Sequence, residues 1–204
     1  MTGVTVMPRD GDWTVADLAD IPDDGLQYEL ADGVLLVSPA PRPRHQVVAG
    51  ELYVLLRAAC PPDLQVLFSP VDFQPTDRRS LQPDVLVVRR SDVGETRIVE
   101  PLLLAVEVLS PSTRSKDLLL KRGLYQDSGV TSYWVVDPEE PSVLVLELEG
   151  GRYVEAGRAV GDQVLRPGLP FPVALQPALL LDAVPGSRAA ADLPMPPTWQ
   201  IRRS

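Results

Sequence analysis

Two carboxylates stand where strands would carry apolar side chains. Glu107 interrupts the apolar run from Leu102 to Leu109, and Asp84 begins the run Asp84–Val88 directly after Pro83. Burying a carboxylate in a central strand is costly unless the group is paired or bound to a metal. If the two strands pair antiparallel with 84 opposite 107, both carboxylates reach the same end of one sheet. Two like charges that close favour a bound divalent cation.

A lysine on the following helix could complete this group. Asp117, Lys121 and Tyr125 are spaced four residues apart and share one helix face. If that face packs on the sheet, Lys121 can reach back to the strand end. Each residue also has a structural interpretation. Glu107 could reach solvent at a strand end or pair with an arginine, while Asp84 could be a turn residue and Lys121 a solvated one.

Turn and capping residues mark where helices and strands begin and end, and so predict the elements that position these side chains. Thr14–Ala19 is a short helix, with Thr14 as N-cap and Asp17 at the capping-box position. Asp32-Gly33 forms a turn between two strands. From His45 onward the predicted order is helix, three strands, helix, strand, which describes a mixed α/β domain. The expected ranges are helix 45–60, strands 64–69 (continuing through 71–73), 84–88 and 102–109, helix 113–128, strand 132–136, and a hairpin of 142–148 with 152–156.

Composition narrows the classes of function. The 204-residue chain carries 19 basic and 28 acidic residues, a net charge of −9, which opposes broad electrostatic attraction to nucleic acid. One cysteine, Cys60, excludes intrachain disulfides and cysteine-cluster metal sites. A single histidine argues against a histidine zinc site, and no glycine-rich phosphate loop follows a strand. Apolar runs are too short to span a membrane, and residues 1–13 lack signal-peptide features, so we expect a cytoplasmic protein without membrane partners.

Proline is unevenly distributed along the chain. Eight of the 22 prolines lie between Pro167 and Pro197. We therefore predict one domain over residues 1–166, with a core of about 28–148, and a proline-rich tail or strap over 167–204.

Several motifs together resemble the Uma2 family of restriction-endonuclease-like proteins. They are Tyr28–Gly33, Ser38–His45, Pro83–Val85, Val106–Arg114 and Gly129–Pro138. The resemblance covers roughly residues 14–148 and implies the PD-(D/E)xK nuclease core, a mixed α+β sheet. In this sequence the core would carry an extra N-terminal strand and a C-terminal hairpin.

The resemblance also implies roles for individual residues. Asp84 and Glu107 would hold Mg²⁺, or Mn²⁺ in its place, with the backbone carbonyl of Val108 as a further ligand. The superfamily usually places a lysine two residues after the glutamate, where this chain has Leu109; Lys121 would act instead. Glu29 would be an additional acid near the metal, or an ordinary strand-edge or capping glutamate.

Three further residues are candidates for substrate contacts: Arg44, His45 and Arg114. His45 could instead be a polar helix start. Arg78, Arg79, Arg89 and Arg90 could form a basic rim or be solvated loop residues.

The sequence thus predicts a metal-dependent endonuclease that hydrolyses phosphodiester bonds of nucleic acid, with DNA as the expected substrate. A homodimer is a possible assembly. The alternative is an inactive nuclease-fold module that binds nucleic acid or a protein partner.

Overall fold

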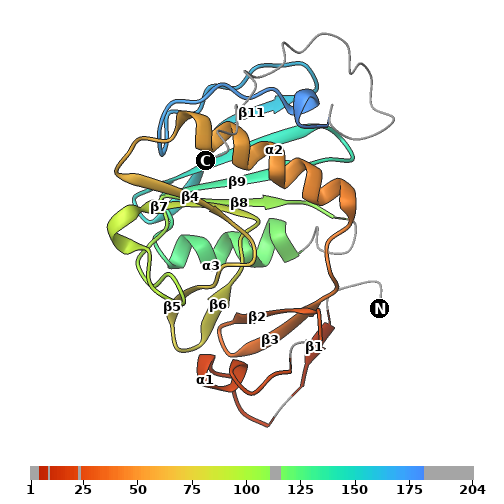
Figure 1. Ribbon diagram of the computed structural model, residues 1–204, viewed down its shortest axis with the longest axis vertical. Coiled ribbons are helices and arrows are strands. Elements are labelled where there is room, and N and C mark those ends of the chain that lie inside the picture. Colours follow the sequence, from red (N-terminus) through yellow and green to blue (C-terminus); the bar gives the residue numbers. More distant parts are fainter. Residues whose placement is uncertain (1–4, 9, 23, 111–115, 182–204) are drawn as a thin grey trace, which may run out of the picture.

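The chain forms two β-sheets and three α-helices in the part that the structure describes (Figure 1). This computed structural model describes residues 5–8, 10–22, 24–110 and 116–181, with the backbone alone over 116–118. The larger sheet is mixed, because only its β8–β9 pair is parallel. Its strands in spatial order are β11 (Arg152–Val160), β10 (Ser142–Glu149), β9 (Ser132–Asp137), β8 (Leu104–Val108), β7 (Val85–Arg89) and β4 (Leu64–Phe68).

The smaller sheet is antiparallel and lies below the larger one in Figure 1. Asp32 and Gly33, with φ of 49° and 89°, form the predicted turn between its two central strands. The short helix α1 (Val15–Leu18) comes before this turn in the chain and has the predicted capping box of Thr14 and Asp17. The strands in spatial order are β1 (Thr5–Met7), β3 (Val34–Ser38), β2 (Gln27–Ala31), β6 (Arg79–Leu81) and β5 (Phe73–Thr76).

Helix α2 (Pro43–Ala59) covers one face of the larger sheet (Figure 1). It begins two residues earlier than predicted, because Pro43 can occupy the first helical turn. Val48, Leu52 and Leu56 follow the expected helical spacing and are fully buried. They pack in one cluster with alternate residues of β7 and β8, so the sheet holds the helix by its apolar stripe.

The opposite face packs against α3 (Arg122–Asp127) and the smaller sheet. A wider, π-helical stretch, η2 (Lys116–Lys121), leads into α3, and Gly129, with φ of 73°, follows its end as predicted. Tyr125 of α3 is fully buried between aromatic rings of both sheets. The predicted core order of helix, three strands, helix, strand is confirmed by α2, β4, β7, β8, α3 and β9.

One hairpin was not predicted. After Phe68 the chain leaves the larger sheet, so the expected continuation of that strand through 71–73 is wrong; β5 and β6 instead join the smaller sheet. Arg79 of β6 is buried and its Nη2 lies 2.6 Å from Asp32 Oδ1, so Arg79 is no part of an exposed basic rim. A turn of 3₁₀ helix, η1 (Arg90–Asp92), follows β7.

The described C-terminal segment folds back over the α2 side of the core. The β10–β11 hairpin turns at Gly150-Gly151 as predicted, although β11 is longer than expected. Phe171, Val173 and Leu175 are buried in the cluster beneath α2, and the 3₁₀ helix η3 (Pro177–Leu181) contacts that helix. Residues 182–204 of the predicted tail lie outside the described residues, and the predicted boundary at 166 stays a prediction. In the part described, no helix combines the length and apolarity needed to cross a bilayer.

Candidate metal and nucleic-acid site

The pairing of β7 with β8 brings the two predicted acids together. Val85 lies opposite Val106, and the Asp84 amide donates to the Val106 carbonyl at 3.0 Å. This is the predicted antiparallel register, continued by one residue to Asp84 and Glu107. In Figure 1 the arrow of β8 points toward the right-hand end of the larger sheet, near the start of α2. The apolar pairs of the two strands therefore fix where the carboxylates meet.

Glu107 is buried with a full set of charged and polar neighbours. Its side chain is 3% exposed, and Oε1 accepts hydrogen bonds from Lys121 Nζ at 2.8 Å and from the Tyr125 hydroxyl at 2.6 Å. Burial, followed by the charges of Glu107 and Glu29, raises the pKa of Tyr125 well above its usual value. Tyr125 is thus a neutral donor at ordinary pH. Among the described residues, Lys121 is a charged partner of the buried glutamate.

Lys121 joins two acids from different sheets. Its Nζ lies 2.8 Å from Glu29 Oε1 of β2 as well as 2.8 Å from Glu107 Oε1 of β8, and all three side chains are nearly inaccessible. Glu29 Oε1 also accepts a hydrogen bond from the Gln82 amide at 3.0 Å. The ammonium lies between the two carboxylates and offsets part of the cost of burying the three groups. We call Glu29, Glu107, Lys121 and Tyr125 the lysine cluster.

Asp84 is held differently, at the edge of this cluster. Its Oδ2 accepts from the Val108 amide at 2.7 Å and lies 3.1 Å from His45 Nε2. Oδ1 contacts no hydrogen-bond donor in the described ranges, and the side chain is 13% exposed. Burial would lower the pKa of His45, but the hydrogen bond and charge of Asp84 outweigh it, so that pKa lies above its ordinary value. Asp84 is thereby oriented while one oxygen stays available.

These donors suit a hard divalent cation. Mg²⁺ prefers oxygen ligands and is commonly held by one or two carboxylates and several waters. Asp84 offers Oδ1, while its Oδ2 accepts from the amide of Val108, the residue that follows Glu107. No group of three or more His, Cys, Asp or Glu side chains is arranged to hold an ion within the described ranges. The two carboxylates are thus the candidate protein ligands within those ranges, a number that Mg²⁺ centres completed by waters commonly use.

The remaining predicted residues fall into three situations. His45 contacts Asp84, as above. The Arg44 Nη2 atom donates to the Pro138 carbonyl, which ties the start of α2 to the end of β9. Arg114 lies outside the described residues. The predicted role of the Val108 carbonyl stays a prediction, whereas the Val108 amide is what holds Asp84.

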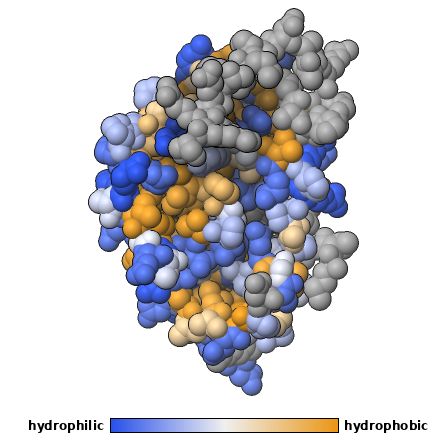
Figure 2. All heavy atoms as spheres, viewed as in Figure 1, coloured by the Kyte–Doolittle hydropathy of each residue, from blue (hydrophilic) through white to orange (hydrophobic). Residues whose placement is uncertain are grey.

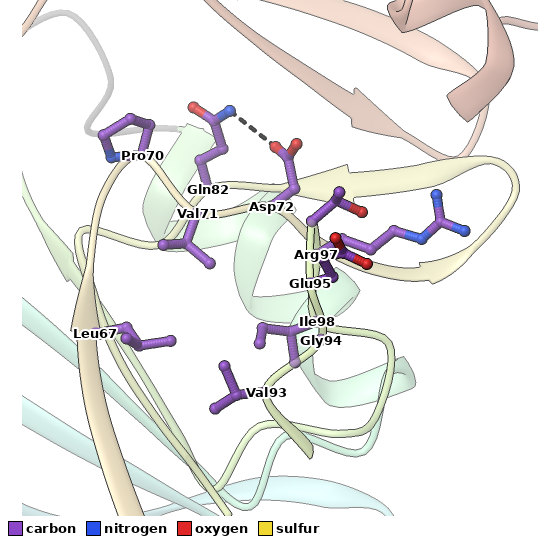
Figure 3. Close-up of a pocket in the computed structure, with 11 residues that line it drawn as sticks. Leu67, Pro70, Val71, Asp72, Gln82, Val93, Gly94, Glu95, Arg97 and Ile98 are labelled. Atoms are coloured by element: carbon purple, nitrogen blue, oxygen red, sulfur yellow. Dashed lines mark hydrogen bonds between the residues drawn. The ribbon is translucent and has the colours of Figure 1, made fainter. Parts of the chain in front are cut away.

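Two residues that shape this site had no role assigned from the sequence. Tyr125 was placed on the helix face of Lys121, and its spacing of four residues from Lys121 was the signal that the two could share a partner. Gln82 gave no signal, because its backbone amide makes the contact with Glu29. Its side chain donates to Asp72 Oδ1 at 2.9 Å in a cavity of about 320 Å³, where Figure 3 shows Leu67, Val93 and Ile98 on one side and the polar groups on the other.

A second hollow opens beside Asp84. It has a volume of about 220 Å³ and lies between the first half of α2 and the end of β4. The residues that line it are Gln46, Ala49, Gly50, Tyr53, Phe68, Ser69 and Asp84.

Comparison with known proteins places this geometry in a family. The model of the Uma2 family, described as "putative restriction endonuclease", matches residues 15–183. Comparison with curated proteins gave no match. A similar solved structure is a crystal structure described as a "putative nuclease belonging to DUF820" from Anabaena variabilis ATCC 29413. It has a TM-score of 0.65 and 18% sequence identity, over 83% of this chain and 97% of that chain. At this identity the likeness shows the fold, which is that of the predicted nuclease class. Because the family model spans most of the sequence, the chain belongs to the Uma2 family.

Proposed function

We propose that this protein is a metal-dependent nuclease that hydrolyses phosphodiester bonds, with DNA as its first substrate to test. The main support for the proposal is that the side chains of Asp84, Glu107 and Lys121 lie at the same end of the larger sheet. A partly open Asp84 lies opposite a buried Glu107, whose Oε1 is 2.8 Å from Lys121 Nζ. Family and fold both indicate a nuclease.

Asp84 and Glu107 are the residues that would hold the cation, Mg²⁺ by preference. When bound, the ion would stabilise charge on the phosphate and make a bound water more acidic. Asp84 would contribute Oδ1, since Oδ2 is already held by the Val108 amide and His45. His45 keeps its carboxylate partner in one orientation, which is a positioning role.

Lys121 would bring positive charge to the substrate side of Glu107. Its ammonium is fixed between Glu29 and Glu107 at 2.8 Å from each, and Tyr125 fixes Glu107 in turn. An ammonium held in this way donates hydrogen bonds in a constant direction and stabilises developing negative charge without reorganisation. The superfamily's lysine position is Leu109 here, a side chain that is buried and apolar, whereas Lys121 contacts Glu107 within the described part of the chain.

Cleavage of nucleic acids by matched variants tests the proposal. Supercoiled plasmid, single-stranded DNA and single-stranded RNA are incubated with Mg²⁺, Mn²⁺ or EDTA. We expect metal-dependent cleavage that Asp84→Asn and Glu107→Gln each reduce by at least about 10²-fold. Glu155→Gln is the control, because Glu155 is an exposed acid paired with Arg158 on β11. Cleavage that persists in both site variants would reject the assignment.

A binding module without catalysis is the second candidate. The net charge of −9 and the enclosure of Lys121 by two carboxylates are its specific support. Calorimetry with Mn²⁺ separates the two functions. Metal binding that is lost in Asp84→Asn favours the nuclease, whereas oligonucleotide binding without metal binding or cleavage favours the module.

A further inference from the structure

The hollow beside Asp84 has an aromatic wall that the fold does not require. Phe68 ends β4 and is 57% exposed, while Leu64 and Val66 on the same face are buried beneath α2. The Phe68 ring meets Tyr53 of α2 edge to face, with ring centroids 4.9 Å apart. On the molecular face that carries α2, Figure 2 shows hydrophobic side chains gathered in separate patches among hydrophilic ones. An exposed aromatic that lines a concave site offers a surface for a planar ligand.

Gly50 is one of the residues that line this hollow. It lies inside the 17-residue helix α2, where glycine is unfavourable relative to alanine. A Cβ built at Gly50 would meet no atom within 4 Å, so close packing does not demand glycine here. At the lining of the hollow, the helix therefore carries a residue that helix propensity disfavours and that close packing does not require.

Polar groups are placed around the aromatic wall. Gln46 Oε1 lies 3.3 Å from His45 Nδ1, which leaves the Gln46 amide NH₂ without a partner among the described residues. The Ser69 hydroxyl also lines the hollow, and Asp84 forms its end. Amide and hydroxyl groups can pair with the donor and acceptor edges of a nucleobase. We call Gln46, Gly50, Tyr53, Phe68 and Ser69 the base pocket.

We propose that the base pocket receives the base of one unpaired nucleotide, whose phosphate lies at Asp84. The proposal rests on the proposed function, since it takes the phosphate to be at the metal site. A volume of about 220 Å³ is below the range typical for drug-sized ligands and suits one planar group. Bases inside a duplex are stacked and cannot enter, so the substrate class is single-stranded or locally unpaired nucleic acid.

The charge of the chain supports the same substrate class. With a net charge of −9, contacts to phosphates cannot supply much affinity through counterion release. Stacking on aromatic rings depends on contact area rather than on net charge, and it tolerates any base. The pocket thus provides an attraction that an acidic protein can use.

Binding to a fluorescent oligonucleotide tests the proposal. The probe is a short oligothymidylate with one central 2-aminopurine, whose fluorescence falls when it stacks, used in EDTA so that no cleavage occurs. We expect Phe68→Ala and Phe68→Leu to weaken binding roughly 5- to 150-fold, the range that base–aromatic stacking gives. Phe68→Tyr retains the ring and should bind like the wild type. Val54→Ala is the control, because Val54 is 60% exposed on α2 outside the pocket.

Filling the pocket gives a second test that does not depend on removing a contact. Gly50→Leu should raise the melting temperature, since leucine favours helices, and should weaken probe binding at the same time. A merely structural role for this region would move both quantities in the same direction. Unchanged binding by both Phe68→Ala and Gly50→Leu, or duplex binding as tight as single-strand binding, would overturn the proposal.

The outcomes also separate this proposal from the nuclease assignment. Cleavage that needs Glu107, together with no effect of Phe68 or Gly50 on probe binding, rejects the base pocket alone. Phe68-dependent quenching without any cleavage supports the pocket and rejects the nuclease function.

Discussion

The two acids at the end of the larger sheet lie in opposite positions but in different surroundings. Glu107 is 3% exposed, and its Oε1 accepts hydrogen bonds from both Lys121 and Tyr125. Asp84 is 13% exposed, and its Oδ1 has no hydrogen-bond partner among the described residues. The Glu107 carboxylate is enclosed by the Lys121 ammonium and the Tyr125 hydroxyl, whereas, among those residues, the Asp84 carboxylate is held through Oδ2 alone. A pair that served only stability would not need this difference.

The difference follows from the faces of the sheet that supply the partners. Lys121 and Tyr125 reach Glu107 from η2 and α3, which cover one face. His45 reaches Asp84 from α2, which covers the other face and leaves the hollow beside it. Enclosure should therefore contribute mainly to folding at Glu107, and accessibility mainly to chemistry at Asp84. Stability measurements on matched variants can break this division.

The largest effect is expected from Lys121→Met. Glu29 and Glu107 would stay buried without their cation, so we expect the free energy of unfolding to fall by about 3–5 kcal/mol. Urea unfolding followed by circular dichroism measures the change. Arg158→Met is the control, since Arg158 is 53% exposed and pairs only at the surface.

A second substitution sharpens the interpretation of Lys121→Met. Adding Glu29→Gln removes one of the two stranded charges, so the double variant should recover part of the lost stability. If Lys121→Met costs no more than Arg158→Met, the lysine cluster does not enclose its charges as we describe.

An intermediate effect is expected from Tyr125→Phe. The ring keeps its packing, but the 2.6 Å hydrogen bond to the ionised Glu107 is lost, and we expect a loss of about 2 kcal/mol. Tyr153→Phe is a matched control, because the Tyr153 hydroxyl donates to the neutral Val130 carbonyl at 2.8 Å. Its loss should cost about 1 kcal/mol. Equal losses in the two variants, measured by urea unfolding, would show that Glu107 needs no help from the hydroxyl.

The sequence predicted the core of this site because strand register and helix spacing are local rules. Setting Asp84 opposite Glu107 also sets Val85 opposite Val106, and the observed pairs follow that register. Lys121 was placed on the correct helix, and the structure brings its Nζ to Glu107.

The contacts that escaped prediction join residues far apart in the chain. The hairpin of β5 and β6 has short strands with a proline, and its Arg79 pairs with Asp32, 47 positions earlier. Glu29 was assigned from the family resemblance, and Lys121 links it to Glu107 of the other sheet. No local pattern encodes such meetings, which arise only when the whole fold is assembled.

The smallest effect on stability is expected from Asp84→Asn, and it completes the comparison. Asparagine keeps an oxygen for the Val108 amide, and Asp84 is partly solvated, so the free energy of unfolding should change by less than about 1 kcal/mol. Under the proposed function the same variant loses Mn²⁺ binding in calorimetry. Glu107→Gln should lower both stability and metal binding, because its partners are buried around it. A loss of stability in Asp84→Asn as large as that in Glu107→Gln would contradict the division between an enclosed and an accessible carboxylate.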